Sequence, residues 1–480
     1  EVLRQCDGQD IVYHGEVSEA HKLALLQGAK ALLYPVSYPP GSGEAHSHKA
    51  VEAMLCGIPC IVYDQGCYPE NVRVMTPDGL RGYQECKVGD LVWSLNTTTG
   101  MMEAKPIQQT YEYDYEGPMV QFRNRRFDFQ VTPNHRMLIR HWYPKPYRKE
   151  WPPEKSCFEY MEASRLLSPG GAKCLPLSAK WAGCDLNIEV PCVPYPNMNK
   201  VPQLDLGNLL ELWGWYIADG CIIKEYGHKY ACHIFISEPQ ANPHRVELEE
   251  LLNRMGLKFG SSRADGVTIH YWELATLFSR AGCTAKTKTI PKELLGAPTD
   301  LLLRLFKGLM YGDGHQSARA GTVYTTVSPN LADRFSELCL KVGYECHLGR
   351  RERKGHSIGD RMLPDIETYE VRVRKHIGMN GQLQPRYVSE TFYKGKVWCF
   401  GIADNNNMLI ESNGDFVFCG NSMREVVNEG VTGFVIPGRY ALPDAIRACE
   451  TLDRKACRAR ALERWDYRNV VARWLPVMEE

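Results

Sequence analysis

The chain has 480 residues, of which 44% are apolar, and its 57 basic and 57 acidic side chains give a formal net charge of zero. This composition is typical of globular proteins and excludes a strongly basic chain that coats nucleic acid, so any DNA-binding surface has to be local. At about 150 residues per domain, the length predicts roughly three domains.

No run of about 18 or more apolar residues occurs, and the chain begins with Glu1-Val-Leu rather than with a signal peptide. We therefore expect a cytoplasmic protein without a membrane span, whose first residue lies within a longer protein. The 18 cysteines are scattered, and none forms a C-x-x-C pair. This pattern predicts free thiols in a reducing compartment rather than a disulfide framework or a zinc site.

The two ends of the chain carry one interrupted pattern of alternating strands and helices. Before position 67, strands are expected at 11–13, 31–36 and 58–64, and helices at 44–56 and after Ser18, with Leu23, Leu26 and Ala29 on one face. After position 421, a helix is expected at 422–428, a strand at 433–436 and mainly helix at 442–465. Such alternation predicts a doubly wound parallel sheet. Joining Gly66 to Ser422 restores an unbroken strand, turn, helix and strand.

The joined ends also carry a recognisable set of residues, namely Glu44, Glu52, Gly57-Ile58-Pro59 and Thr432-Gly433-Phe434. They resemble the nucleotide-sugar-binding, Rossmann-like half of retaining glycosyltransferases of the GT-B type. The resemblance implies that Glu44 lies near the sugar of a nucleotide-sugar donor and that Glu52 binds the ribose hydroxyls. The alternative is that both glutamates are exposed on one amphipathic helix. Because only 66 and 59 residues are covered, we do not expect transferase activity from this chain alone.

The insert between these ends, residues 67–421, opens and closes with short alternating segments. They are Cys67-Tyr-Pro-Glu70, Val88-Gly-Asp-Leu91, Val131-Thr-Pro-Asn-His135, Val397-Trp-Cys-Phe-Gly-Ile402 and Phe418-Cys-Gly-Asn421. Alternating β-branched residues with Asp-Gly and Asn-Gly turns predict short strands. These segments are similar to the splicing blocks of inteins. The similarity implies a monomeric, self-excising element with the mostly-β Hedgehog/intein (HINT) fold.

The resemblance to inteins implies a first step that needs no cofactor. Cys67 attacks the carbonyl carbon of Gly66 and converts the peptide bond to a thioester, because a thiolate is a strong nucleophile. His135 is expected to protonate the departing amide nitrogen, and Thr132 to form a hydrogen bond with that amide.

The later steps are expected at the C-terminal end of the insert. Ser422 takes the acyl group and branches the chain, and Asn421 then cyclises onto its own carbonyl and releases the insert. Inteins typically carry His where this chain has Gly420, and a second His where it has Asn406. Both help asparagine cyclise in the family, so their replacement is expected either to slow or to abolish C-terminal cleavage. Cys399 stands where Asp is frequent in inteins and is expected to assist.

Two other interpretations stay open. The chain is either a glycosyltransferase whose insertion is only a structural or binding module, or an autoprocessing protein that cleaves without ligating. A mere insertion has no need of Cys as its first residue and of Asn before Ser at its end. Gly420 keeps the second interpretation open, because weak asparagine cyclisation favours hydrolysis of the thioester.

Two segments inside the insert share a register, Leu212-Trp-Gly-Trp-Tyr-Ile-Ala-Asp-Gly220 and Phe306-Lys-Gly-Leu-Met-Tyr-Gly-Asp-Gly314. Each has Gly at its third position and Asp-Gly at its end, as an internal duplication would place them. They resemble the signature helices of LAGLIDADG homing endonucleases. The resemblance implies an α+β nuclease domain whose two helices pack through Gly214 and Gly308, with Asp219 and Asp313 side by side.

Paired carboxylates at Asp219 and Asp313 would hold Mg²⁺ for the cleavage of two DNA strands, and Lys288 matches a basic residue that supports catalysis in the family. The implied partner is double-stranded DNA of the uninterrupted host allele. Basic residues at 350, 351, 353, 354, 372, 374 and 375 either follow DNA phosphates or form a solvated charged strand.

These inferences divide the chain into six segments. Residues 1–66 belong to the host protein, 67–145 to the splicing domain, 146–200 to a bridge, 201–385 to the nuclease, 386–421 again to the splicing domain, and 422–480 again to the host protein.

Overall fold

The fold comes from a computed structural model, which describes residues 17–34, 48–63, 67–141, 158–168, 173–189, 204–224, 232–263, 266–317, 321–353, 357–358, 361–362, 365–374, 381–420, 427, 430–436 and 442–466. The chain divides into two compact units, the first formed by Glu1–Gly66 with Ser422–Glu480 and the second by Cys67–Asn421. The strand expected at 11–13, most of the helix expected at 422–428, and the site residues Glu44, Asn421 and Ser422 lie outside the described residues.

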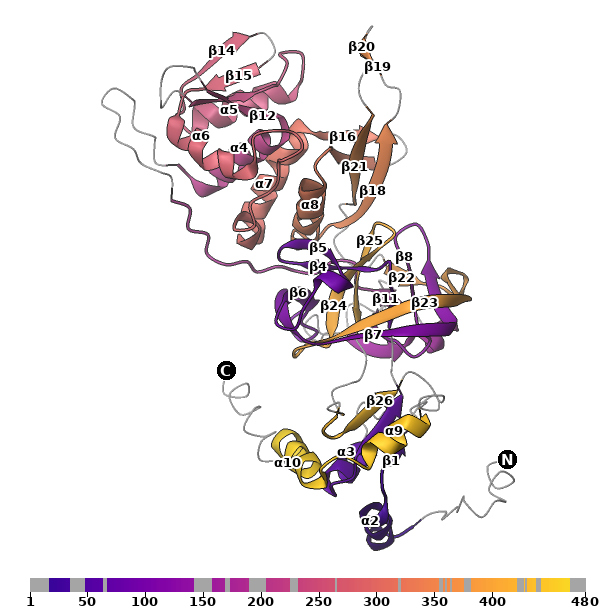
Figure 1. The fold of residues 1–480 in the computed structure, drawn as a ribbon. Helices are drawn as coiled ribbons and strands as arrows, with labels where there is room; N and C mark the ends of the chain where they lie inside the picture. Colours follow the sequence, from indigo (N-terminus) through magenta and orange to yellow (C-terminus); the bar gives the residue numbers. More distant parts are fainter. Residues whose placement is uncertain are drawn as a thin grey trace, which may run out of the picture. The chain divides into compact units, whose positions relative to one another are not determined.

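The first unit contains a parallel sheet, as the alternating pattern predicts. Its order is β1 (Leu32–Tyr34), β2 (Cys60–Tyr63) and β26 (Gly433–Ile436), and both pairings are parallel. Indigo and yellow segments from the two ends of the chain meet here (Figure 1). The helices of this unit are α2 (Glu19–Gly28), α3 (His48–Leu55), α9 (Leu442–Cys449) and α10 (Arg454–Trp465).

Helices cover both faces of this sheet. Successive side chains of β2 point to opposite faces, so neighbouring residues of β2 pack against different helices. Cys60 packs in a cluster with residues of α3 and α10, whereas Ile61 packs with residues of α9. α2 begins after Ser18, whose hydroxyl accepts a hydrogen bond from the backbone N–H of His21 at 3.3 Å. The predicted helix start at Ser18 is confirmed.

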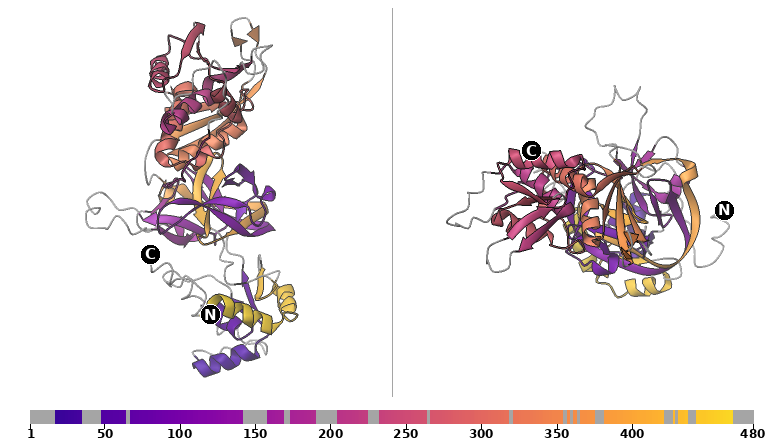
Figure 2. Two further views of the ribbon diagram at one scale, coloured as in Figure 1. Left: turned by 90° about the vertical axis from the view of Figure 1, so that its left-hand side faces the viewer. Right: turned by 90° about the horizontal axis from the view of Figure 1, so that it is seen from above.

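The second unit has a strand-rich region, residues 67–141, 158–189 and 381–420, in which strands from both ends of the insert pair with each other. β7 (Met102–Arg123) and β23 (Val388–Ile402) form a long antiparallel ribbon. β3 (Tyr68–Pro69) pairs with β23, and β24 (Asn407–Ser412) pairs with both β4 (Arg73–Thr76) and β25 (Asp415–Gly420). Purple and orange strands are accordingly interleaved in every view (Figures 1 and 2). The region also contains β5 (Gly79–Gly82), η1 (Tyr83–Glu85), β6 (Leu91–Leu95), β8 (Asp128–Val131), β9 (Arg136–His141) and η6 (Pro385–Tyr387).

Some residues of the segment 146–200, which the sequence predicts as a bridge, belong to the strand-rich region instead. β10 (Phe158–Glu162) and β11 (Lys173–Leu175) both pair with β9. β11 also pairs with β22 (Gly381–Leu383), which the sequence assigns to the nuclease. These pairings leave no clear signal in the sequence, because strands of three to five residues carry little periodicity and their partners are not adjacent in the chain. η3 (Ala163–Leu167) follows β10.

Residues 204–374 form a helix-bearing region in which each predicted repeat segment is a helix that leads into an antiparallel sheet. α4 (Leu206–Asp219) precedes the sheet β12-β13-β15-β14, and α7 (Thr299–Gly312) precedes the pairing of β16, β17, β21 and β18. The remaining elements are β12 (Gly220–Lys224), β13 (Cys232–Ile236), α5 (His244–Arg254), β14 (Phe259–Arg263), β15 (Gly266–Ile269), α6 (Trp272–Phe278), η4 (Ser279–Ala281), η5 (Leu294–Gly296), β16 (Gly314–Ser317), β17 (Gly321–Thr326), α8 (Pro329–Lys341), β18 (Glu345–Arg353), β19 (Ser357–Ile358), β20 (Arg361–Met362) and β21 (Ile366–Arg374).

The two regions of the second unit share a sheet and a core. β18 of the helix-bearing region pairs with β25 of the strand-rich region, and Nδ1 of His347 lies 2.9 Å from Oδ1 of Asp415. The Lys341 ammonium of α8 lies 4.0 Å from the ring centroid of Trp93 and 4.2 Å from that of Trp181. One apolar cluster contains Trp93 together with Phe335 of α8. The described parts of the two regions therefore share one apolar interior.

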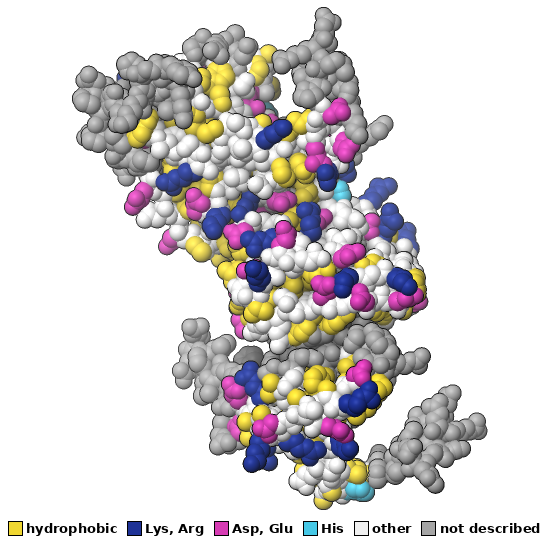
Figure 3. Space-filling model, in the orientation of Figure 1, with side chains coloured by type: hydrophobic (Ala, Val, Ile, Leu, Met, Phe, Trp, Pro, Cys, Tyr) yellow, Lys and Arg dark blue, Asp and Glu magenta, His cyan; other side chains and the backbone are white. Residues whose placement is uncertain are grey.

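On the face drawn in Figure 3, lysine and arginine side chains are interspersed with acidic ones rather than gathered in one patch. This mixture agrees with the formal net charge of zero. None of the helices among the described residues has the length and apolar character needed to cross a bilayer.

Candidate catalytic centres

The first residue of the second unit, Cys67, is held by two backbone hydrogen bonds to Thr132. The Cys67 N–H donates to Oγ1 of Thr132 at 2.9 Å, and the Thr132 N–H donates back to the Cys67 carbonyl at 3.1 Å. Cys67 is 2% exposed. Thr132 therefore contacts the backbone nitrogen that belongs to the Gly66–Cys67 peptide bond, as the sequence predicts.

His135 lies in the same buried place and faces the other end of the insert. Its backbone N–H donates to the Thr132 carbonyl at 3.0 Å, and its Nε2 lies 3.3 Å from Sγ of Cys419. The Tyr68 ring packs edge-on against the His135 imidazole at a centroid distance of 4.5 Å. Burial raises the pKa of the Cys419 thiol to about 12, so this group stays a neutral thiol at physiological pH. We call Cys67, Tyr68, Thr132, His135, Cys419 and Gly420 the cysteine centre.

The last described residue of the second unit also belongs to the cysteine centre. The Tyr68 hydroxyl donates to the Gly420 carbonyl at 2.5 Å. A Cβ atom at Gly420 would lie 1.9 Å from the Arg136 carbonyl oxygen. The histidine that the intein resemblance leads one to expect at this position therefore has no room unless β9 moves. Gly420 is a packing requirement of this chain and not only a missing catalytic group.

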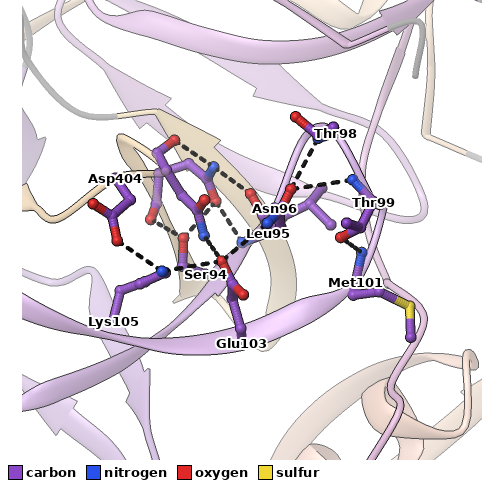
Figure 4. Close-up of polar contacts among 11 residues, drawn as sticks. Ser94, Leu95, Asn96, Thr98, Thr99, Met101, Glu103, Lys105 and Asp404 are labelled. Atoms are coloured by element: carbon purple, nitrogen blue, oxygen red, sulfur yellow. Dashed lines mark hydrogen bonds and ion pairs between the residues drawn. The ribbon is translucent and has the colours of Figure 1, made fainter. Parts of the chain in front are cut away.

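Asn406 lies in the turn before β24, the strand that pairs with β25. Asn407 pairs with Gly420 in the β24–β25 ladder, and Asn406 has a left-handed backbone with φ of 52°. The buried Asn407 amide fixes this turn, because its Oδ1 accepts from the Leu95 N–H at 2.7 Å and its Nδ2 donates to the Leu95 carbonyl at 2.8 Å. In the same network, Lys105 lies between Asp404 and Glu103 (Figure 4).

Cys399 is buried next to the cysteine centre. It lies on β23, opposite Tyr111, and is 0% exposed. Burial is the main cause of the raised pKa of Cys419, and the nearby Cys399 adds to it. The pKa of Tyr68 is raised by burial first, then by Cys419 and then by Cys399. The Cys399 thiol forms a weak contact with the Phe400 carbonyl at 3.7 Å. Among the described residues the structure thus brings Cys67, Thr132, His135 and Cys399 together.

The helices α4 and α7 cross at two glycines. A Cβ atom on Gly308 would lie 2.0 Å from the Glu211 carbonyl, and one on Gly214 would lie 2.5 Å from the Leu305 carbonyl. Any side chain at either position would therefore push the helices apart. The buried Glu211 carboxylate lies 2.9 Å from both Arg304 and Lys307 of α7. The predicted packing through the two glycines is what the structure contains.

This packing brings together the acidic ends of the helices. A Cβ atom at Gly312 would lie 2.9 Å from Oδ2 of Asp219, so the Asp219 side chain reaches the residue before Asp313. Burial raises the pKa of Asp219 against the opposing effect of Lys288. Burial and then the Asp219 charge raise the pKa of Asp313 to about 7.

Lys288 lies between the two carboxylates and the end of α4. Its Nζ donates to the Ala218 carbonyl at 2.6 Å and lies 5.7 Å from the Tyr216 ring centroid. Burial lowers the pKa of Lys288, and the charges of Asp313 and Asp219 oppose this effect. The structure therefore brings Asp219, Asp313 and Lys288 into one charged cluster.

A third carboxyl group, which the sequence did not single out, joins this cluster. Glu238 follows β13, is 1% exposed, and its neighbour Ser237 donates its N–H to the Asp219 carbonyl at 3.0 Å. Burial and then the Asp219 charge raise the pKa of Glu238 to about 7. We call Asp219, Glu238, Lys288 and Asp313 the carboxylate centre.

The carboxylate centre has the oxygen donors that suit Mg²⁺. Among residues the structure describes, no group of three or more His, Cys, Asp or Glu side chains is placed to enclose a metal ion. Two carboxylates are nevertheless a usual protein contribution to Mg²⁺, which keeps several waters and takes substrate phosphates as further ligands.

The basic stretch on β18 and β21 is largely engaged in contacts within the protein. Arg350 pairs with Glu367, and Arg351 lies 3.0 Å from Glu370. The Arg374 guanidinium donates to the Arg125 carbonyl at 2.7 Å. These contacts favour the alternative of a charged strand. Lys354 and Lys375 lie outside the described residues.

The predicted nucleotide-sugar residues are only half described. The Glu52 carboxylate lies 3.2 Å from the Lys22 ammonium, and both side chains are partly exposed. Glu44 lies outside the described residues, so the pair cannot be placed together.

Comparisons with known proteins give similarities to separate stretches of the chain. Residues 7–82 match the family described as Glycosyl transferases group 1. An ATP-dependent Clp protease proteolytic subunit from Chlamydomonas moewusii is 32% identical over 302 residues, which are 60% of this chain and 29% of that protein. The chain thus spans less than a third of this relative. Because the first unit holds only 66 and 59 residues, most of the match falls within Cys67–Asn421.

Three solved structures are similar to smaller stretches. Mesophilic variants of the homing endonuclease I-DmoI are 11% identical, with a TM-score of 0.27 over 35% of this chain and 90% of that chain. I-DmoI in complex with DNA and Mn is 12% identical, with a TM-score of 0.25 over 35% and 90%. A variant of the Ssp DnaB mini-intein is 10% identical, with a TM-score of 0.15 over 20% and 77%.

Sequence reasoning missed Tyr68, Cys419 and Glu238 as members of the two centres. No sequence signal links Tyr68 to Gly420, because the two residues are 352 positions apart. Cys419 stands inside the last of the splicing blocks, but its contact with His135 spans 284 positions. Glu238 had one available signal, since a carboxylate directly after a short strand near the repeat is a candidate for the same site.

Proposed function

We propose that this chain is a protein-splicing precursor, in which an intein of residues 67–421 excises itself and joins residues 1–66 to residues 422–480. The observation that carries the proposal is the meeting of both ends of the insert in the cysteine centre. Thr132 binds the Cys67 N–H, and Tyr68 binds the Gly420 carbonyl. Ligation of two flanking segments requires this proximity, because the acyl group has to pass from one junction to the other.

In the first step, the Cys67 thiolate attacks the Gly66 carbonyl carbon. A C–S bond forms, the Gly66–Cys67 C–N bond breaks, and a proton moves to the departing nitrogen. The hydrogen bond from that nitrogen to Thr132 orients the amide. His135, buried against the Tyr68 ring, supplies the proton.

In the following steps, the Ser422 hydroxyl attacks the thioester carbon, and the thiolate of Cys67 leaves. The Asn421 side-chain amide nitrogen then attacks the Asn421 carbonyl carbon, which breaks the bond to Ser422 and forms a succinimide. The freed amino group of Ser422 finally displaces the ester oxygen and leaves a Gly66–Ser422 peptide bond. We propose that both ends then form part of a glycosyltransferase. The match of residues 7–82 supports this for the first end. Glu44 and Glu52 would face its nucleotide-sugar donor.

Intact-mass spectrometry of the freshly expressed chain tests this proposal. Prorating 54.6 kDa by residue count gives about 40 kDa for the excised insert and about 14 kDa for the ligated ends. Both species together are expected. A species of about 7 kDa for residues 1–66 without any ligated product would show cleavage without ligation. An intact precursor alone, with Cys67 reduced, would contradict the proposal.

We also propose that residues 201–385 are a site-specific DNA endonuclease, because the carboxylate centre joins two partly buried carboxylates and a lysine at the ends of paired helices. Asp219 and Asp313 would hold Mg²⁺, which when bound neutralises phosphate charge and lowers the pKa of water. Lys288 would oppose the negative charge that develops at the phosphate.

A duplex DNA that encodes residues 1–66 fused directly to residues 422–480 tests this activity. We expect a double-strand cut near the fusion point with Mg²⁺ and no cut with a chelator. A duplex in which the coding sequence of the insert separates the two ends is the matched control and should stay intact. Equal cutting of both duplexes, or no cutting of either, would contradict the proposal.

A further inference from the structure

The Tyr68 hydroxyl contacts the backbone at the C-terminal end of the insert, where it donates to the Gly420 carbonyl. It comes directly after Cys67, and the Gly420 carbonyl that it binds comes directly before Asn421. This hydrogen bond therefore links the two reacting ends of the proposed intein.

Packing on several sides fixes the position of this hydroxyl. The Tyr68 ring is 0% exposed and lies 4.5 Å from the His135 ring centroid and 5.2 Å from that of Trp398. Trp398 is fixed in turn, because its Nε1 donates to the Pro69 carbonyl at 3.0 Å. Burial raises the pKa of Tyr68 well above its usual value, so the hydroxyl remains a donor over the physiological pH range.

The acceptor of this hydrogen bond, the Gly420 carbonyl, belongs to a residue that packs closely against β9 because it has no side chain. Gly420 ends β25, and a Cβ atom there would lie 1.9 Å from the Arg136 carbonyl. No side chain at position 420 can therefore assist asparagine cyclisation. The place where an intein typically presents His is closed, and the Tyr68 hydroxyl approaches the Gly420 backbone from elsewhere in the fold.

A bond to the Gly420 carbonyl acts on the following residue through the peptide group. The carbonyl of one residue and the N–H of the next lie in one plane. Fixing the Gly420 oxygen therefore fixes the direction in which the Asn421 backbone starts. Cyclisation needs the side-chain nitrogen to approach the backbone carbonyl carbon within about 3.5 Å, so fewer unproductive orientations raise its rate.

We propose that Tyr68 is a positioning residue for Asn421 cyclisation and takes over some of the role that a histidine at position 420 has in similar inteins. This inference rests on the proposed splicing function. It predicts that loss of the hydroxyl slows release of residues 422–480 and leaves thioester formation at Cys67 nearly unchanged.

The test compares Tyr68→Phe with Tyr83→Phe in the full chain. Tyr83 also contacts Trp398, with its ring stacked at a centroid distance of 5.4 Å, and its hydroxyl accepts a hydrogen bond from the Gln84 amide. C-terminal release is measured in a Cys67→Ala background, which isolates asparagine cyclisation. Thiol-induced cleavage after Gly66 is measured in an Asn421→Ala background, which isolates the thioester.

We expect Tyr68→Phe to slow C-terminal release by about three- to tenfold, the loss of one hydrogen bond, and to change thiol-induced cleavage by less than about twofold. Tyr83→Phe should change neither rate by more than about twofold. Equal slowing of both reactions by Tyr68→Phe, or equal effects of the two substitutions, would overturn the positioning role. If the Cys67→Ala parent releases nothing and the Asn421→Ala parent is not cleaved by thiol, the splicing proposal itself fails, and this inference fails with it.

Discussion

The cysteine centre and the carboxylate centre are assembled from the chain in different ways. The cysteine centre takes its residues from both ends of the second unit, so that Tyr68 contacts a residue 352 positions away. The carboxylate centre takes Asp219 and Asp313 from the C-terminal ends of two repeated helices, each of which is a continuous local segment. The residues of the cysteine centre meet only when the two ends of the second unit come together. The two aspartates of the carboxylate centre meet because α4 and α7 cross.

The two centres also differ in charge. The cysteine centre is built from thiols, a phenol, an imidazole and backbone groups, and burial keeps its Cys419 and Tyr68 side chains neutral. The carboxylate centre buries acidic groups whose pKa values rise toward 7 at Asp313 and Glu238. We infer that the activity of the cysteine centre depends mainly on hydrogen-bond geometry. The activity of the carboxylate centre depends mainly on a cation that compensates its negative charge. Perturbations should therefore separate the two activities.

Among the substitutions, Cys67→Ala is expected to separate splicing from DNA cleavage most strongly. Without a nucleophile the first acyl shift cannot occur, so ligated product should disappear entirely, while DNA cleavage stays within about twofold of the parent. Mass spectrometry and a plasmid-cutting assay measure the two activities. Cys86→Ala, which removes another buried thiol of the strand-rich region, is the matched control and should still splice. Ligated product from Cys67→Ala would refute the mechanism.

The converse separation is expected from Asp219→Asn. Loss of this negative charge weakens the hold on Mg²⁺, so DNA cleavage should fall by at least about 100-fold while splicing continues. Asp300→Asn, at the first turn of α7 in the same helix pair, should change neither activity. Cutting rates on the fused duplex and the yield of ligated product measure the result. A splicing defect in Asp219→Asn would break the division into two centres.

A smaller effect is expected from Gly308→Ala. The new Cβ atom would lie 2.0 Å from the Glu211 carbonyl, so α4 and α7 have to separate. Overpacking of this kind costs about 1–3 kcal/mol, which corresponds to a fall of about 1–4 °C in the Tm of a unit as large as the second one. Gly296→Ala, where no atom lies within 4 Å of the added Cβ, is the control. Calorimetry that finds equal Tm values for the two variants would contradict the helix crossing.

The smallest effect is expected from pH. The pKa of Asp313 rises from 3.8 to about 7 on folding. Between these values the folded chain binds more protons than the unfolded chain, so this group's contribution to stability is lost as pH rises toward 7. Metal-free protein should therefore lose a few degrees of Tm relative to Asp313→Asn between about pH 4.5 and pH 7.5. Mg²⁺ should raise the Tm more at pH 7.5 than at pH 4.5, and parallel Tm profiles would exclude the effect.

Several features followed from the sequence by itself because they depend on local patterns. The alternation of strands and helices at the ends predicted the parallel sheet of β1, β2 and β26, and Ser18 predicted a helix start. The shared register of the two repeats predicted paired helices with glycines at the crossing. Periodicity, turn residues and capping residues act over a few positions, so a single sequence reveals them.

Only the tertiary structure decided which distant residues meet. The contacts of Tyr68 with Gly420 and of His135 with Cys419 span 352 and 284 positions, and the pairing of β10 and β11 with β9 had no periodic signal. Gly420 is a further example. The sequence indicates only that the histidine typical of inteins is absent at this position, whereas the structure shows that the Arg136 carbonyl leaves no room for a side chain there. Such contacts depend on how complete sheets pack and on which buried polar groups need partners, and neither is encoded within a short stretch of chain.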